Sequence, residues 1–297
     1  MNTFIRTSKN LLIATAVVAL MTAATAQARA EGNNVDLHYV AVGVSKIPMM
    51  PPQHQLRYAH KDAQDLARVW EAQKGKIYTN VHGETLTDET AKLSDIMAAL
   101  DRLISNAKKG DTAVVSFAGH GGVLPGRNPQ WVFETSNFDP KDVQGTLLFE
   151  SALREKLAKL AAGGVNVILV LDTCHAGAFG SGDSGIVVLA ACAATQSSGE
   201  HELVGNGFYT SALIEALSGK ADLNGDGIIT LEEVETYVAK RVAEYDAMYP
   251  AFDHNGQKMV QIPTSFRPAS MQNGLALAGG SNNNTLPPGI NMDRVRN

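Results

Sequence analysis

The sequence predicts an α/β domain in which helices cover both faces of a mostly parallel sheet. Short apolar segments typical of buried strands alternate along the chain with segments of helical periodicity. The chain has 297 residues, of which 44% are hydrophobic and 19% are charged, so a disordered protein is excluded. We therefore expect a three-layer sandwich of helices, sheet and helices.

The first half of the predicted domain contains three strands and two helices. Residues 36–45 alternate and then run apolar, as a buried strand does, and a loop with three prolines follows. Residues 56–73 and 88–107 carry apolar side chains at three-and-four spacing, which predicts amphipathic helices. Residues 77–86 and the apolar run 112–118 predict two further strands.

The second half begins with a polar loop around Trp131 and continues with the same alternation. A helix is expected where apolar residues share one face, and a strand where an apolar run is short and β-branched. Expected helices cover residues 149–162, 207–217 and 231–245, and expected strands cover residues 165–171 and 186–191. Residues 268–297 are polar and rich in Gly and Asn, so we expect a disordered tail after a domain at 31–267.

Residues 1–30 have the three parts of a secretory signal peptide. Arg6 and Lys9 precede an almost unbroken apolar run over residues 11–26, and small-x-small cleavage patterns follow. An uncleaved anchor is the alternative, but 16 residues are fewer than the roughly 20 that a spanning helix needs. We expect an exported protein, periplasmic or secreted, without stable membrane insertion after cleavage.

The charge balance argues against nucleic acid as a partner. The chain has 25 Lys+Arg against 30 Asp+Glu. Residues 1–30 hold three of the basic residues and no acid, so removing them leaves 22 against 30, a net charge of −8. Such a chain lacks the basic face that nucleic acid requires.

Two of the predicted strands lead to reactive side chains. Strand 112–118 is followed by His120, and strand 165–171 by Cys174. Because ligands of open α/β sheets bind beyond the carboxyl ends of the strands, we expect both side chains at one crevice. An imidazole can generate a thiolate, so Cys174 is a candidate nucleophile. Gly121 lets a backbone N–H approach a substrate carbonyl, and with the Cys174 N–H it would form an oxyanion hole.

The sequence around these two residues resembles the two signatures of the caspase/metacaspase superfamily of cysteine peptidases. The matching segments are SFAGHG at residues 116–121 and LDTCHAG at residues 171–177, and His120 precedes Cys174 by 54 residues. The resemblance covers roughly residues 35–267 and implies a caspase-like fold. The cysteine motif is most similar to that of bacterial metacaspase-like proteins, the orthocaspases.

This resemblance implies an endopeptidase that forms a thioester, with Cys174 as nucleophile and His120 as general base and acid. It places Asp172 in the pocket for the residue before the cleaved bond, where a carboxylate selects Arg or Lys. The chain departs from metacaspases at Ala194 and Thr195, where those relatives carry another acid, although Glu200 is nearby. We therefore expect one carboxylate in the pocket and weaker binding of Arg.

Residues 222–233 match the EF-hand calcium loop at every ligand position and at its turn glycine. A solvated turn of Asp, Asn and Gly is the alternative. We expect Ca²⁺ as a structural or regulatory cofactor that the chemistry does not need, with weak affinity because the loop is alone. The expected ligands are Asp222, Asn224, Asp226, the Ile228 carbonyl, Thr230 and Glu233.

Several alternatives remain open from the sequence. An inactivated peptidase fold could serve as a calcium-binding interaction module, and the same thiol could hydrolyse non-peptide acyl substrates. Cys192 is either simply buried or forms a disulfide with Cys174 that blocks the nucleophile. His175 is expected to shape its loop. Residues 160–219 contain no Lys or Arg, so an enzyme with basic specificity should remain a single chain.

Overall fold

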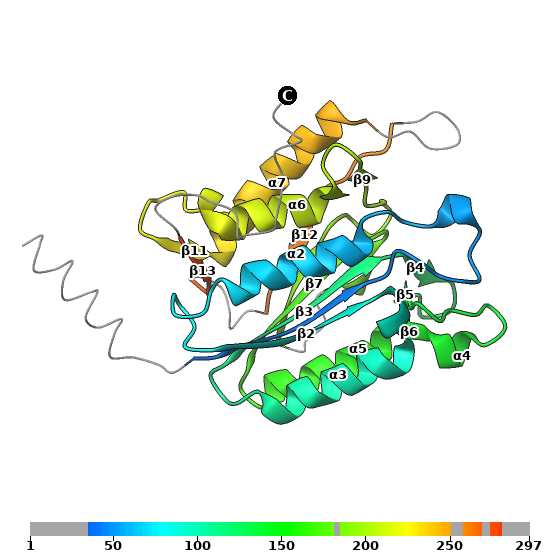
Figure 1. Ribbon diagram of the computed structural model, residues 1–297, viewed down its shortest axis with the longest axis horizontal. Coiled ribbons are helices and arrows are strands. Elements are labelled where there is room, and N and C mark those ends of the chain that lie inside the picture. The colour runs from blue at the N-terminus through cyan, green and yellow to red at the C-terminus, as the bar shows by residue number, and fades with distance from the viewer. Residues whose placement is uncertain (1–34, 181–184, 251–257, 269–273, 281–297) are drawn as a thin grey trace, which may run out of the picture. The chain divides into compact units, whose positions relative to one another are not determined.

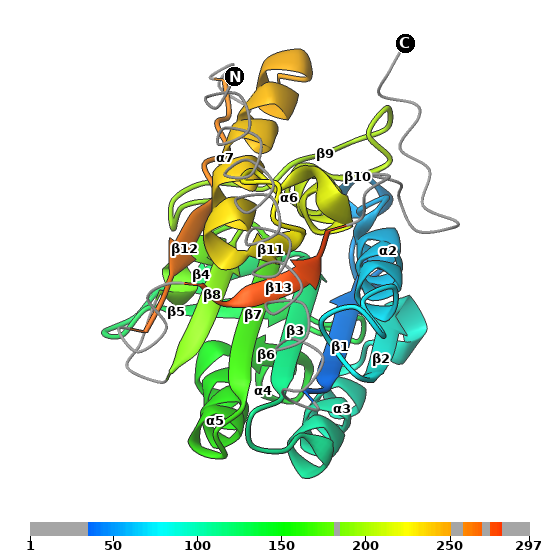
Figure 2. The same cartoon turned by 90° about the vertical axis from the view of Figure 1, so that its left-hand side faces the viewer.

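The computed structural model describes residues 35–180, 185–250, 258–268 and 274–280, and it confirms the α/β class. The central sheet has the order β12-β8-β7-β3-β1-β2, in which β12 is the antiparallel member (Figures 1 and 2). Its strands are β1 (Leu37–Gly43), β2 (Val81–Thr87), β3 (Thr112–Gly119), β7 (Asn166–Thr173), β8 (Ile186–Ala190) and β12 (Thr264–Phe266).

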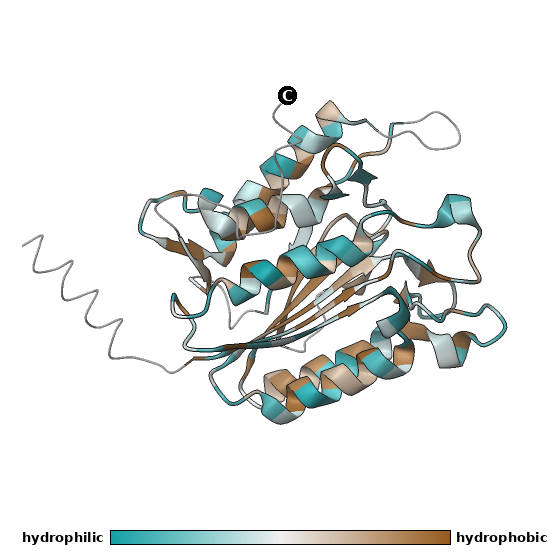
Figure 3. Cartoon of the chain, in the orientation of Figure 1, coloured by the Kyte–Doolittle hydropathy of each residue, from teal (hydrophilic) through white to brown (hydrophobic). Residues whose placement is uncertain are grey.

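Helices cover both faces of this sheet, as predicted (Figure 1). Alternate strand residues enter two hydrophobic clusters: Val114 belongs to the first and Val115 to the second. Figure 3 shows strands that are largely hydrophobic and helices that mix both kinds of residue, as a sheet covered on both faces requires. One face carries α2 (Ala59–Glu71), α6 (Phe208–Glu215) and α7 (Leu231–Met248), and the other carries α3 (Leu93–Asn106) and α5 (Glu150–Ala162).

The prediction of a polar loop around Trp131 is wrong. The chain forms a small antiparallel sheet there, and the single turn α4 (Val143–Thr146) lies just before the last strand of that sheet. Trp131 and Phe133 are buried and stack on each other, and both lie against Phe117 of the central sheet. The strands of the small sheet are β4 (Gly121–Leu124), β5 (Gln130–Glu134) and β6 (Leu147–Phe149).

The prediction of a disordered tail from residue 268 is wrong for residues 276–279. These residues form strand β13 (Ala276–Gly279), which pairs with β11 (Ile228–Thr230) in the predicted calcium loop. Leu277 and Ala278 of β13 are buried in the cluster under α2, α6 and α7, so two apolar residues anchor the segment. Residues 281–297 lie outside the described residues.

The expected signal peptide at residues 1–30 also lies outside the described residues. Among the residues that the structure describes, no helix is long and apolar enough to cross a membrane.

Candidate active site

Strands β3 and β7 are neighbours, and their register brings His120 and Cys174 together. Gly119 pairs with Thr173, so the next residue along each parallel strand is His120 or Cys174 (Figure 2). Both side chains line one pocket of about 100 Å³, and Asp172 lines it too. The predicted convergence of these residues at the carboxyl ends of the strands is therefore present.

The turn after Cys174 is held in an unusual backbone conformation. His175 has φ = 57°, a left-handed conformation that few residues other than glycine adopt. Its N–H donates to the Gln196 carbonyl (2.8 Å), and its Nδ1 lies 2.9 Å from the Ala194 carbonyl oxygen. These contacts hold the sharp turn that leaves Cys174 partly exposed at the pocket. His175 thus occupies the loop-shaping position that the sequence suggested.

The imidazole of His120 is oriented by the proline-containing loop after β1. Its Nε2 lies 2.7 Å from the backbone carbonyl oxygen of His54, in the short helix Pro52–His54. A carbonyl only accepts hydrogen bonds, so Nε2 carries the hydrogen and Nδ1 is left as the basic nitrogen. No sequence pattern indicated this contact, because it joins residues 66 positions apart in the chain.

The backbone of Gly121 lies so close to Thr173 and Cys174 that there is no room for a side chain at this position. A Cβ atom at this position would lie 2.5 Å from Thr173 Oγ1 and 2.9 Å from the Cys174 carbonyl oxygen. Any other residue would push these strands apart. This close approach places Gly121 beside Cys174, and its role in an oxyanion hole with the Cys174 N–H stays a prediction.

Asp172 is buried at the pocket and held entirely by neutral donors. Its Oδ1 accepts from the Ser198 hydroxyl (2.5 Å), and its Oδ2 accepts from Thr210 N–H (3.0 Å) and the Thr210 hydroxyl (2.7 Å). Burial raises the pKa of the Asp172 carboxyl, and these hydrogen bonds oppose the rise without cancelling it.

The structure adds Asp62 of α2, a second buried carboxyl that sequence reasoning did not place in the pocket. Its Oδ1 accepts from Asn206 Nδ2 (2.8 Å) and from Gly207 N–H (3.0 Å). A Cβ atom on Gly207 would lie 2.5 Å from Asp172 Oδ2 and 3.2 Å from Asp62 Oδ2, so the two carboxyls flank one glycine. Asp62 shares a helix face with Ala59 and Ala63, and a carboxyl on that apolar face was the available signal.

The pKa of Asp62 is perturbed by burial and by the charge of Asp172. Burial raises the pKa of Asp62 well above its usual range, and the charge of Asp172 raises it further. The hydrogen bonds from Asn206 and Gly207 only partly offset this effect. Neither carboxyl takes part in the ion pairs formed among the described residues. The pocket therefore combines two buried acids with no cation paired to either.

The expectation of a single carboxylate in the pocket is thus wrong. Glu200, on the short strand Glu200–His201, lines the pocket as well. Its carboxylate accepts from the N–H groups of Arg57 and Tyr58, at 2.8 and 3.1 Å, just before α2 begins. Glu200 therefore satisfies free amides at the start of the helix that carries Asp62.

Cys192 is a free, fully buried thiol. Its Sγ donates to the carbonyl oxygens of Thr173 (3.4 Å) and Gln196 (3.2 Å), and burial raises its pKa to about 12. A thiol with that pKa is a poor partner for disulfide exchange. Of the two alternatives for Cys192, the structure supports burial, because Cys174 is also free.

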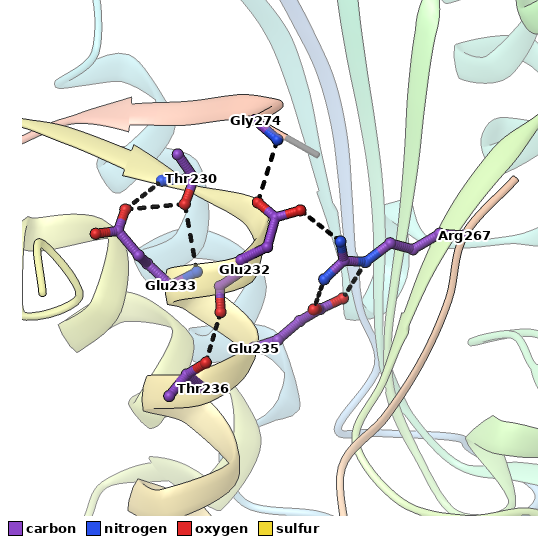
Figure 4. A network of polar contacts seen from close by, with 7 residues as sticks. All are labelled: Thr230, Glu232, Glu233, Glu235, Thr236, Arg267 and Gly274. Carbon is purple, nitrogen blue, oxygen red and sulfur yellow. Dashed lines mark hydrogen bonds and ion pairs between the residues drawn. The ribbon is translucent and has the colours of Figure 1, made fainter. Parts of the chain in front are cut away.

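The predicted calcium loop follows a turn of π-helix at residues 216–220, which continues α6. The Oδ1 atom of Asp222 is buried and has no hydrogen-bond partner among the described residues, and a bound cation would satisfy this oxygen. Glu233 instead caps α7: its Oε2 accepts from Thr230 N–H and from the Thr230 hydroxyl, both at 2.9 Å (Figure 4). No group of three or more His, Cys, Asp or Glu side chains among the described residues is placed to hold a metal.

Comparisons with known proteins agree with this geometry. A family model described as the caspase domain matches residues 40–270. No curated protein matches the chain. The crystal structure of protein GSU0716 from Geobacter sulfurreducens is similar in fold, with a TM-score of 0.57 and 16% sequence identity, and the match covers 83% of this chain and 100% of that one. The caspase model spans both strands that end at His120 and Cys174, and the chain therefore belongs to the caspase-domain family of cysteine peptidases.

Proposed function

We propose that the protein is an exported cysteine endopeptidase that cleaves peptide bonds after Arg or Lys. The observation that carries this proposal is the pair of buried carboxyls, Asp62 and Asp172, which line one pocket with Cys174 and have no cation paired to them among the described residues. A guanidinium or ammonium group from a substrate would supply that missing charge. Arg suits the site best, because its planar fork can bond two carboxylates at once.

The proposed chemistry follows from the orientation of His120. Nδ1 takes the proton of the Cys174 thiol, and the thiolate attacks the carbonyl carbon of the substrate. The Gly121 and Cys174 N–H groups stabilise the oxyanion. His120 then gives its proton to the leaving amine as the C–N bond breaks and a thioester remains. A water molecule, deprotonated by His120, hydrolyses the thioester and restores the thiol.

Hydrolysis of fluorogenic peptides tests this function. Peptides ending in Arg, Lys, Asp or Asn are compared using the wild type, Cys174→Ala and His120→Ala. Cleavage after Arg or Lys that disappears in both variants is expected. Cleavage after Asp alone would contradict the role of the two carboxyls, and turnover that survives Cys174→Ala would contradict the nucleophile.

The calcium-binding interaction module is the second candidate, and the unpaired Asp222 oxygen favours a bound cation. Calcium would be held by oxygen atoms of Asp222, Asn224, Asp226, Ile228, Thr230 and Glu233, a donor set that suits a hard cation. The ion would order the loop and take no part in the reaction. Covalent labelling of Cys174 by a thiol-reactive peptide separates the two candidates, because an inactive module should not react selectively.

Export and the single-chain state are parts of the same proposal. Cleavage of the segment 1–30 would give a mature N-terminus near Glu31, which N-terminal sequencing of protein from the periplasm or medium would detect. Intact mass after incubation with calcium would remain that of one chain. A cut between Cys174 and Glu200 would contradict basic specificity, since residues 160–219 hold no Lys or Arg.

A further inference from the structure

Glu134 on β5 is a carboxyl next to the candidate histidine that the proposed chemistry does not use. Its backbone N–H donates to the His120 carbonyl oxygen at 3.0 Å. The β4–β5 register pairs Gly121 with Phe133, so the next pair in this antiparallel ladder is His120 and Glu134. Residues directly opposite in such a ladder carry their side chains on the same face, with Cβ atoms about 5 Å apart.

The end of the Glu134 side chain is withdrawn from solvent. Its Oε2 atom is buried and has no hydrogen-bond partner among the described residues. Burial raises the pKa of the Glu134 carboxyl, and the charge of His120 acts in the opposite direction. A buried carboxylate oxygen without a partner destabilises a fold unless another charge stabilises it. For Glu134, His120 is the group in position to do so.

The other carboxyls that face His120 have hydrogen bonds elsewhere. Asp172 is held by Ser198 and Thr210, Asp62 by Asn206 and Gly207, and Glu200 by the amides before α2. The thiol of Cys174 also faces this pocket, and the carbonyl of His54 binds the far side of the imidazole. Among these carboxyls, Glu134 is distinguished by an oxygen that remains unused.

We propose that Glu134 is a positioning residue whose carboxylate stabilises the imidazolium that His120 forms on taking the proton of Cys174. The proposal rests on the Cys174–His120 dyad proposed above. The proton moves from Sγ to Nδ1 and later to the leaving amine, and Glu134 neither gives nor takes a proton. Its negative charge offsets the positive charge that the imidazole acquires, while the His54 carbonyl fixes the ring.

The test compares Glu134→Gln, which removes the charge and keeps the shape, with Glu134→Asp, which keeps the charge. The control is Glu89→Gln, because Glu89 is an exposed acid remote in sequence from the site. The first readout is the rate of Cys174 alkylation by iodoacetamide across pH 4–10, which reports the thiolate without any peptide. The second is kcat/KM and KM for an Arg peptide over the same range.

In Glu134→Gln we expect the pH midpoint of alkylation to rise by about one unit and kcat/KM to fall about tenfold, with KM for the Arg peptide unchanged. Glu134→Asp should recover part of both effects, and Glu89→Gln should match the wild type. A Glu134→Gln enzyme with wild-type alkylation and kcat would overturn the proposal. An equal loss in the Gln and Asp variants would also overturn it, because shape rather than charge would then matter.

Two further outcomes must be told apart: a Glu134→Gln variant that does not fold, and a wild type that cleaves no peptide. If the Gln variant loses its folded circular dichroism spectrum, Glu134→Ala is alkylated with and without acetate: recovery by acetate supports the proposal, and no recovery overturns it. If the wild type cleaves no peptide in a Cys174-dependent manner, the proposed peptidase function fails. The alkylation series still decides the role of Glu134 in that case.

Discussion

A buried carboxyl lies at each end of helix α6, and the two carboxyls have different kinds of partners. Near the start of the helix, Thr210 donates hydrogen bonds to Asp172 from its N–H and its hydroxyl, and no cation in the part of the chain that the structure describes pairs with that acid. Its last residue, Glu215, accepts from Lys220 Nζ (2.6 Å), Arg241 Nε (3.2 Å) and the Tyr237 and Tyr245 hydroxyls (both 2.7 Å). Asp172 lines a pocket without an ion-pair partner among the described residues, whereas Glu215 forms ion pairs with Lys220 and Arg241.

The pKa shifts of these acids differ in sign for the same reason. Burial alone would raise the pKa of Glu215, but hydrogen bonds from Lys220, Tyr237 and Tyr245 and the charge of Lys220 lower it overall. Burial raises the pKa of Asp172, and its neutral donors cannot reverse the rise. Burial is therefore common to both acids, but Glu215 has a charged partner, Lys220, besides its tyrosine donors, whereas the charge of Glu200 adds to the rise at Asp172. The comparison separates a carboxyl that stabilises the fold from one that can receive a charged substrate.

The largest expected effect is on stability, at the paired acid. Glu215→Ala leaves Lys220 and Arg241 around an empty site, and we expect it to lower the free energy of unfolding by about 3–5 kcal/mol. Chemical denaturation at pH 7 measures this. Glu89→Ala, at an exposed position, is the control and should unfold like the wild type. A Glu215 variant as stable as the wild type would remove the distinction between the two ends of α6.

The next effect is on activity, at the unpaired acid. Asp172→Asn should lower kcat/KM for an Arg peptide about 100-fold, because the variant loses one of the charges that would bind the guanidinium. The loss should be smaller for a peptide with a neutral residue at the same position. An equal loss of kcat/KM on both peptides would mean that Asp172 stabilises the site but does not bind the charged side chain of the substrate.

The pH dependence of stability has opposite signs for Asp62, the unpaired acid on α2 next to Asp172, and for Glu215. Because the folded pKa of Asp62 is raised, the folded state binds more protons, and its contribution to stability falls as pH rises from about 4 through that raised value. For Glu215 the contribution is present above the unfolded pKa and is lost as pH falls through the lowered folded value.

Asp62→Asn isolates the first of these contributions. It keeps an oxygen for Asn206 and Gly207 but removes the charge, so the fall in stability as pH rises from about 4 through the raised pKa of Asp62 should become shallower. KM for an Arg peptide should rise as pH falls in the wild type, by up to about tenfold per unit below the raised pKa, and should depend less on pH in the variant. Unfolding curves and KM across this range provide the measurements. A steeper pH dependence in Asp62→Asn would contradict the assignment.

The smallest expected effect concerns Asp222, a third acid, which lies beyond the π-helical turn that continues α6. Calcium at about five times its Kd should stabilise the wild type by about 1 kcal/mol and raise its Tm slightly. Asp222→Asn should abolish the shift, and magnesium should not reproduce it. A calcium-independent Tm in the wild type would leave the loop as a solvated turn.

Much of the site could be read from neighbouring residues in the chain. Strand β7 and the glycine-flanked motif at its end predicted Cys174, and β3 predicted His120, because buried strands have a strong local signal. The β4–β5–β6 sheet escaped prediction, since its strands are short and its stability comes from Trp131 and Phe133 packing on Phe117. Strand β13 was not predicted for a similar reason: it pairs with β11, whose residues lie 46 to 51 positions earlier in the chain.

The sequence alone determined the α/β class and the order along the chain of the parallel central strands and the helices that cover them, and it predicted the thiol and imidazole, because each depends on periodicity or on residues adjacent in the chain. It did not predict the antiparallel edge strand β12. The tertiary structure decided which groups surround them. Asp62 and Glu134 reach the site from α2 and β5, and the His54 carbonyl reaches His120 from a loop. Those contacts join segments far apart in the chain, and the desolvation that gives the carboxyls their properties exists only after the helices and strands have packed.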